Sequence, residues 1–183
     1  MVEELLEKIP PEKRWAITTR FLCTLSILRG SRIMPSVLGM EEGVLAPVWG
    51  WEKWVEIHER LNNEGAKIIF PWVKERFNIP VEDALGAAKL NIVVAEFFCG
   101  PEQEYELIEA TKEKTVDKTT KCIWHEMFNE FEVDPELRAM CHGCEGWVVE
   151  GIKSVNPKIA FKLTKAMPRG DSYCEFVFKF KEE

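Results

Sequence analysis

The sequence lacks several features that would point to common classes of function. It has no run of lysine and arginine that would form a basic stripe, and its net charge is −7. Nucleic-acid binding is therefore a poor expectation, since nucleic-acid sites gather positive charge. It also lacks an uncharged apolar stretch of about 18 residues, so we expect no membrane span. The acidic, amphipathic start lacks the basic and apolar segments of a secretory signal, so we expect a cytoplasmic protein.

Familiar catalytic motifs are missing as well. There is no phosphate-binding loop, dinucleotide fingerprint, nucleophile elbow or HExxH pattern, which argues against kinases, Rossmann dehydrogenases, α/β-hydrolases and zincins. What the chain does have is 46 % hydrophobic residues, including 11 Phe and 7 Trp among 183 residues. That is enough for a core without disulfides. In a cytoplasmic protein, the six cysteines indicate thiols, metal ligands or redox centres before structural disulfides.

Hydrophobic periodicity predicts an α+β fold in a single domain, residues 1–183. Its first half, residues 1–99, has the periodicity of helices. We expect helices at 2–8, 11–30, 49–63, 65–77 and 81–98.

The second half, residues 100–183, alternates polar and apolar residues in four places and predicts the order β-β-α-α-β-β. The expected strands are about 104–110, 114–122, 158–167 and 172–180. The expected helices are 123–131 and a second helix, or a broken pair, that Asp134 caps and that ends near 155. The helical N-terminal half should pack on an antiparallel four-stranded sheet, with two helices inserted between the hairpins.

Candidate chemistry gathers around the CHGC pair, Cys141 and Cys144. This spacing lets both sulfurs reach one metal ion or close a redox disulfide, whereas buried cysteines also simply fill space. A structural zinc site usually has a second such pair, which is missing here. We predict that Cys122 and Cys174 converge with the pair, with zinc or iron as the candidate metal. Two further cysteines on apolar helix faces, Cys23 and Cys99, are expected to be core.

Catalytic candidates lie beside these cysteines. His125 follows Cys122 by three residues and could activate its thiol, while Glu145 and Glu150 could be a general base, a metal ligand or solvated charges. Trp51, Trp124 and Trp147 are the candidates for ligand contacts; for Trp51, core packing or a subunit interface is the other interpretation.

The alternation in the closing strand predicts the direction in which its first cysteine points. By period-two alternation, Cys174 should face inwards with Phe176, Phe178 and Phe180. Asp171 precedes this strand and is expected to stabilise the turn with its carboxylate.

The stretch from Thr119 onwards, TKCIWHEMFNEF and then CHGCEGWVVEGIKSVNPKIAFKLTKAMPRGDSYCEF, resembles the L-2-amino-thiazoline-4-carboxylate hydrolase-like family. The resemblance implies the opening of a cyclic amidine-type ring. The closing GDSYCEF also resembles the 4-vinyl-reductase domain, which implies ligand sensing and, in some members, a zinc held by cysteines. Cys174 and either Cys141 or Cys144 match those cysteines, but Ala166 stands where a third would lie.

Three functional hypotheses follow. The first is a hydrolase of a small cyclic C–N substrate, with a cysteine or a metal-bound water as nucleophile and Glu145, Glu150 or His125 as proton-transfer partner. The alternative is a sensor or carrier that binds a small organic molecule without turnover. The third is an assembly partner with an aromatic interface, and a homodimer is expected.

Overall fold

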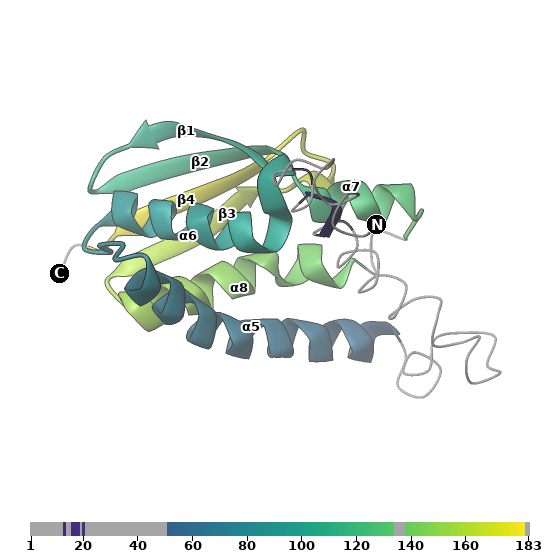
Figure 1. Ribbon diagram of the computed structural model, residues 1–183, viewed down its shortest axis with the longest axis horizontal. Coiled ribbons are helices and arrows are strands. Elements are labelled where there is room, and N and C mark those ends of the chain that lie inside the picture. The colour runs from purple at the N-terminus through teal and green to yellow at the C-terminus, as the bar shows by residue number, and fades with distance from the viewer. Residues whose placement is uncertain (1–12, 14–15, 19, 21–50, 134–137, 182–183) are drawn as a thin grey trace, which may run out of the picture.

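The computed structural model describes residues 13, 16–18, 20, 51–133 and 138–181 (Figure 1). Its centre is a four-stranded antiparallel sheet in the order β1-β2-β4-β3. The strands are β1 (Glu104–Ala110), β2 (Lys114–Lys121), β3 (Ile159–Lys165) and β4 (Cys174–Phe180). The helices are α5 (Trp51–Arg76), α6 (Ala84–Cys99), α7 (Ile123–Glu130) and α8 (Ala139–Val155). The predicted α+β fold and its four strands are confirmed.

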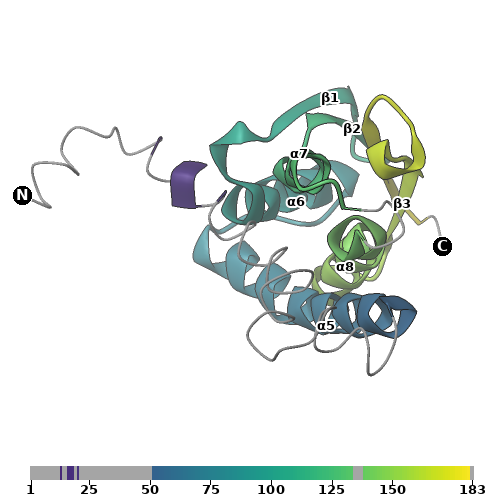
Figure 2. The ribbon, with the colours of Figure 1, turned by 90° about the vertical axis from the view of Figure 1, so that its right-hand side faces the viewer.

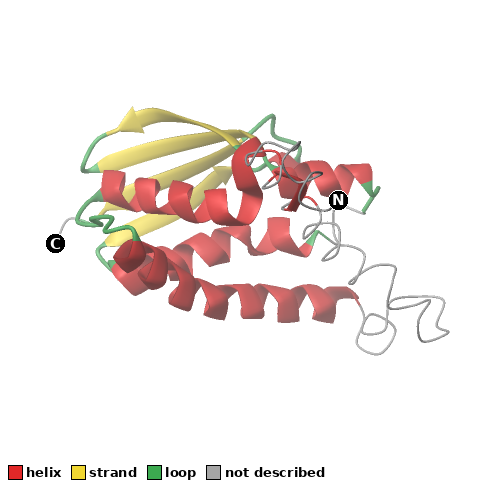
Figure 3. Ribbon diagram, viewed as in Figure 1, coloured by secondary structure: helices red, strands yellow, loops and turns green. Residues whose placement is uncertain are grey.

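The helices form a second layer on one side of the sheet, as Figure 3 shows. Helix α6 packs on β2 and β4, α8 packs on β3, and α5 runs along α8 as an outer helix (Figure 2). Phe70 of α5, Leu90 of α6, Ile152 of α8 and Phe178 of β4 are among the fully buried side chains between these layers. Their burial is the main stabilising contribution that holds the helices on the sheet.

The strand register determines which side chains face the helices. Thr119 pairs with Cys174, and Asp117 pairs with Phe176. Because directly opposed residues of an antiparallel pair point to the same face, these side chains lie together on the helix-covered face. Phe176 and Phe178 are buried, as the alternation predicted, whereas Phe180, expected to be buried with them, is exposed at the end of the strand.

The boundaries of the helices differ from the prediction in two places. The expected helices at 49–63 and 65–77 are one continuous helix, α5. Gly65 does not end it, because the ring of Trp147 on α8 packs over this position and supports the helix from outside. Helix α6 begins at Ala84 instead of residue 81, since Asp83 caps it by accepting a hydrogen bond from the Gly86 N–H at 2.9 Å.

Other predicted elements end earlier or cannot be compared. Strand β3 ends at Lys165 and β4 begins at Cys174, because a short 3₁₀ helix, Met167–Arg169, occupies part of the connection. The expected helices at 2–8 and 11–30, and the Asp134 cap, lie largely or wholly outside the described residues.

One helical stretch in the described part of the chain, Ala84–Glu102, is long and apolar enough to cross a membrane by length and composition alone. It consists of α6 and the short turn that follows. Ala87, Leu90 and Val94 of this helix are buried in the core. A core helix satisfies the same criterion, and core contacts account for part of its apolar character, whereas Phe97 and Phe98 near its end are exposed.

Candidate functional site

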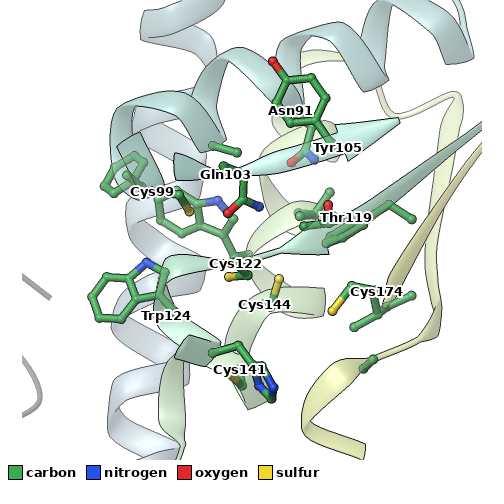
Figure 4. Close-up of a pocket in the computed structure, with 18 of the residues that line it drawn as sticks. Asn91, Cys99, Gln103, Tyr105, Thr119, Cys122, Trp124, Cys141, Cys144 and Cys174 are labelled. Carbon is green, nitrogen blue, oxygen red and sulfur yellow. The ribbon is translucent and has the colours of Figure 1, made fainter. Parts of the chain in front are cut away.

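A cavity of about 160 Å³ lies between the sheet and the helices. Its walls come from β2, β4, α6, α7 and α8 (Figure 4). Most of this wall is apolar, with Phe98, Trp147, Leu163 and Phe176 among its side chains. The Trp147 ring is held by edge contacts with Phe98 and Phe70, at 5.2 and 5.8 Å between centroids. A mostly apolar lining with a few polar groups is typical of a site for a small organic molecule.

Free cysteines are the most unusual feature of this wall. The structure brings Cys122, Cys141, Cys144 and Cys174, the four cysteines expected to converge, around one cavity, and Cys99 joins them. Figure 4 shows the sulfur atoms of Cys122, Cys144 and Cys174 directed towards the open space. Among the residues that the structure describes, no group of three or more His, Cys, Asp or Glu side chains is arranged to hold a metal ion. Zinc or iron binding stays a prediction from the sequence.

Cys122 differs from the other thiols in its electrostatics. A hydrogen bond from Cys99 is the largest cause that lowers the pKa of Cys122 to about 7, and the backbone N–H groups of His125 and Trp124 add to it. These amides belong to the first turn of α7, and Cys122 is the N-cap residue of that helix. Its sulfur lies near the amides but does not form a regular capping hydrogen bond. Burial opposes the shift. A substantial fraction of Cys122 is thus thiolate at neutral pH, which is the reactive form.

Three other thiols of the cavity, those of Cys141, Cys144 and Cys174, are held protonated. Burial raises the pKa of Cys141 to about 12 and that of Cys174 to about 11, and it raises the pKa of Cys144 well above its usual value. The negative charge of Cys122 adds to all three shifts. One nucleophilic thiol therefore stands among inert ones.

Asp117 brings a carboxyl group into the same cavity. It lies on β2, is only 2 % exposed, and its Oδ1 has no hydrogen-bond partner among the described residues. Burial raises the pKa of Asp117 to about 7, because an apolar surrounding disfavours the charged form.

Further polar atoms in the cavity wall are buried and lack partners in the described part of the chain. They are Gln103 Oε1, Trp124 Nε1 and His125 Nδ1. Burial, and secondly the positive charge of Arg138, lower the pKa of His125, so its imidazole is neutral at pH 7. Buried polar atoms are usually paired, and such exceptions in a cavity wall are suited to a ligand.

The predicted acid–base glutamates lie elsewhere. Glu145 is not part of the cavity wall; its Oε1 accepts a hydrogen bond from the Leu163 N–H on β3 at 3.1 Å. Glu150 is also absent from the wall and forms ion pairs with Lys67 at 3.5 Å and Lys153 at 3.7 Å. Both glutamates are close to the CHGC pair in sequence, but their carboxylates bond to groups outside the cavity wall.

The tryptophan candidates and the closing turn can be placed as well. Trp124 and Trp147 line the cavity, while the side chain of Trp51 lies outside the described set. Asp171 accepts a hydrogen bond from the Ala166 N–H at 2.8 Å, the turn-stabilising role expected of it.

The sequence interpretation missed several residues of the cavity wall, and two of them, Cys99 and Asp117, matter most for its chemistry. Cys99 was expected to be core, because it follows the apolar face of a helix, but its thiol reaches Cys122. Asp117 was not singled out, because one acidic residue in a strand with alternating polarity has no distinguishing pattern. Its inward position in the 114–122 alternation, in register with apolar partners, was the available signal.

Several solved structures superpose on this chain with TM-scores below 0.5. A trafficking protein particle complex subunit 3 from Naegleria fowleri, covalently bound to palmitic acid, superposes with a TM-score of 0.47 and 10 % identity, covering 91 % of this chain and 96 % of that chain. The phenol-responsive sensory domain of the transcription activator PoxR superposes with a TM-score of 0.47 and 10 % identity, covering 86 % of this chain and 73 % of that chain. An H-NOX domain from Shewanella oneidensis superposes with a TM-score of 0.43 and 10 % identity, covering 90 % of this chain and 98 % of that chain. Likenesses of this degree determine neither ligand nor activity.

Sequence comparison is more decisive. No curated protein matches the chain significantly. The sequence model of the L-2-amino-thiazoline-4-carboxylic acid hydrolase family matches residues 57–178, which is more than half of the chain and includes every cavity residue named above. The protein belongs to the L-2-amino-thiazoline-4-carboxylic acid hydrolase family.

Proposed function

We propose that the protein is a hydrolase that opens a small cyclic amidine-type substrate in this cavity, with Cys122 as the nucleophile. The observation that carries the proposal is one thiol with a pKa of about 7 in the wall of a mostly apolar cavity. A thiolate at neutral pH is a strong nucleophile, and apolar walls keep competing water away. Family membership favours the same reaction class.

The reaction balances without an oxidant or reductant. The Cys122 thiolate adds to the amidine carbon, and the C=N electron pair moves to nitrogen, which takes a proton. A lone pair on an amino nitrogen of the tetrahedral adduct re-forms a C=N bond and expels the ring atom, which takes a second proton. Water attacks the carbon of this ring-opened adduct, a C=O bond forms as the Cys122 thiolate leaves, and the two protons of the water replace the two taken up before. One water is consumed, and the thiolate is regenerated.

His125 is the proton-transfer partner that the geometry favours. Its ring lies in the cavity wall, its Nδ1 is unpaired among the described residues, and its lowered pKa keeps it neutral at pH 7. A neutral imidazole can accept a proton from the attacking water and return it to a leaving group. Glu145 and Glu150, whose carboxylates bond elsewhere, do not take part in this proposal.

Mass spectrometry of 2-amino-2-thiazoline-4-carboxylate, before and after incubation, tests the proposal. The unmodified protein should convert it to a product heavier by one water. Cys122→Ala should reduce turnover at least about a thousandfold, as removal of a nucleophile does. Glu106→Gln, an exposed change on β1 outside the cavity, should have no effect. Unchanged substrate with the unmodified protein, or full turnover by Cys122→Ala, would contradict it.

The second candidate is a module that binds a small organic molecule without turnover. The mostly apolar wall favours it as much as it favours a hydrolase, because such walls bind ligands whether or not chemistry follows. It predicts a bound but unchanged ligand in the same incubation. Zinc or iron on the thiols, a cytoplasmic location and a homodimer remain proposals from the sequence.

A further inference from the structure

The cavity has two chemically different ends. Figure 4 shows Trp124 and Cys141 at one end of the close-up, Asn91 and Tyr105 at the other, and Cys122 between them. Asp117 belongs to β2, five positions before Cys122, and faces inwards opposite Leu107 on β1 and Phe176 on β4. The carboxyl group is therefore separated along the cavity wall from the nucleophilic thiol.

The surroundings of Asp117 offer it no cation. The described residues that line the cavity include no lysine or arginine. The titratable groups that share the wall are Tyr105 of β1, His125 of α7 and the thiols. The Tyr105 hydroxyl donates to Glu96 Oε1 on α6 at 3.1 Å. Asn91 of α6 and Phe176 of β4 carry no charge, so no described element opposes the carboxyl group with a positive charge.

A buried hydrogen-bond acceptor without a partner raises the free energy of the ligand-free protein, so a ligand that brings a donor to it gains binding free energy. Apolar walls cannot distinguish a ring that bears an N–H group from the same ring without one, whereas an unpaired carboxyl oxygen can. An anionic ligand group at this end would be repelled by the carboxylate form of Asp117.

We propose that Asp117 is the recognition group for an N–H donor, so that the cavity selects small cyclic amidines or amines that are basic at neutral pH. The inference rests on the proposed function for the choice of this cavity as the substrate site, but it concerns binding and does not require Asp117 to take part in bond cleavage. Burial holds the pKa of Asp117 near 7, and an approaching cation would lower it. Binding should therefore convert Asp117 to the carboxylate and release its proton.

Two small probes test the recognition. 2-Amino-2-thiazoline carries N–H donors, and 2-methyl-2-thiazoline has the same ring with a methyl group in their place. Calorimetry with the Cys122→Ser variant prevents turnover from disturbing the measurement. The amino compound should bind at least about tenfold more tightly, which is the effect of one hydrogen bond to a charged group.

Matched variants assign the preference to Asp117. In the Cys122→Ser background, Asp117→Asn should reduce the preference to less than about threefold, because the negative charge is lost. Glu106→Gln removes one exposed carboxylate from the neighbouring strand and should leave the preference intact. Circular dichroism and melting curves verify that both variants are folded.

Proton release gives a readout without altering Asp117. At pH 6, titrations of the amino compound in two buffers of different ionisation enthalpy should reveal release of close to one proton per ligand bound. Equal affinity for the two probes, no binding of either, or a preference that survives Asp117→Asn would overturn the proposal. If the amino compound is preferred through Asp117 but no cyclic amidine is hydrolysed by the unmodified protein, the recognition stands and the proposed hydrolase function fails.

Discussion

Cys99, the last residue of α6, forms a hydrogen bond to Cys122, which precedes α7, and this contact is the largest cause of the low Cys122 pKa. The two residues are far apart in sequence and come from different kinds of position, a helix C-terminus and a helix N-cap. Their contact couples the packing of α6 on the sheet to the reactivity of the cavity thiol. A change at Cys99 should therefore act on chemistry more than on stability.

Replacing Cys99 should change the alkylation profile of Cys122. In the unmodified protein, the rate of Cys122 modification by iodoacetamide should rise with a midpoint near pH 7, its pKa. Cys99→Ala removes the donor and should move the midpoint towards 9.0, the ordinary value for a cysteine thiol. Cys99→Ser keeps a donor and serves as the matched control. Peptide mapping by mass spectrometry follows each cysteine separately.

The same experiment addresses the predicted metal. A chelator should leave the Cys122 profile unchanged if the thiol is free. If chelation instead releases stoichiometric zinc or iron and exposes Cys122 to the reagent, the thiols are metal ligands. An unchanged midpoint in Cys99→Ala would contradict the role of the Cys99 hydrogen bond.

Asp117 should make the folded protein less stable as the pH rises. Its folded pKa of about 7 lies above its usual value of 3.8, so between these values the folded state binds more protons than the unfolded state, and stability falls with increasing pH. Asp117→Asn removes this dependence and should gain about 1–4 kcal/mol over the unmodified protein between pH 4 and pH 8, since one pKa unit corresponds to about 1.36 kcal/mol. Urea unfolding at several pH values measures it. Parallel curves for the two proteins would contradict a raised pKa.

Two glycine substitutions should have opposite effects on stability. A Cβ on Gly151 of α8 would overlap the Phe70 ring of α5, so Gly151→Ala should cost about 1–3 kcal/mol by overpacking. A Cβ on Gly65 of α5 would lie 3.5 Å from the Trp147 ring, an ordinary contact. Gly65→Ala should gain up to about 1 kcal/mol from helix propensity. Thermal unfolding of both variants measures the difference, and destabilisation by Gly65→Ala would show that the Trp147 ring leaves no room for a Cβ at this position.

The sequence predicted the sheet well because each strand carries its own signal. The alternation in β4, with Phe176 and Phe178 buried, reflects a local period that needs no knowledge of the partner strand. The continuous α5 was missed, because Gly65 is a weak helix residue by itself and the support of Trp147 comes from a helix some 80 positions later in the chain. Tertiary packing overrides propensity in such places.

The sequence predicted which cysteines line the site, but it did not predict which thiol is activated or that Asp117 contributes a carboxyl group. The CHGC pair has a recognisable spacing, and both its cysteines line the cavity. The activation of Cys122 depends on Cys99, a contact that no spacing reveals. Asp117 matters because its neighbours in the fold are apolar, which a strand sequence shows only after its register is known.

Glu145 should prove to be a stabilising residue and not a proton-transfer group. Its Oε1 accepts the Leu163 N–H of the edge strand β3 at 3.1 Å, and so ties α8 to the sheet. Glu145→Ala leaves this N–H without its acceptor and should cost about 1–3 kcal/mol of unfolding free energy. Glu145→Gln retains an acceptor oxygen and should restore most of that loss. Urea unfolding should separate the two variants, whereas turnover per folded molecule should stay within about twofold for both, because the carboxylate does not reach the cavity. A large loss of turnover in Glu145→Gln at unchanged stability would instead return Glu145 to the acid–base role that its position beside the CHGC pair suggested.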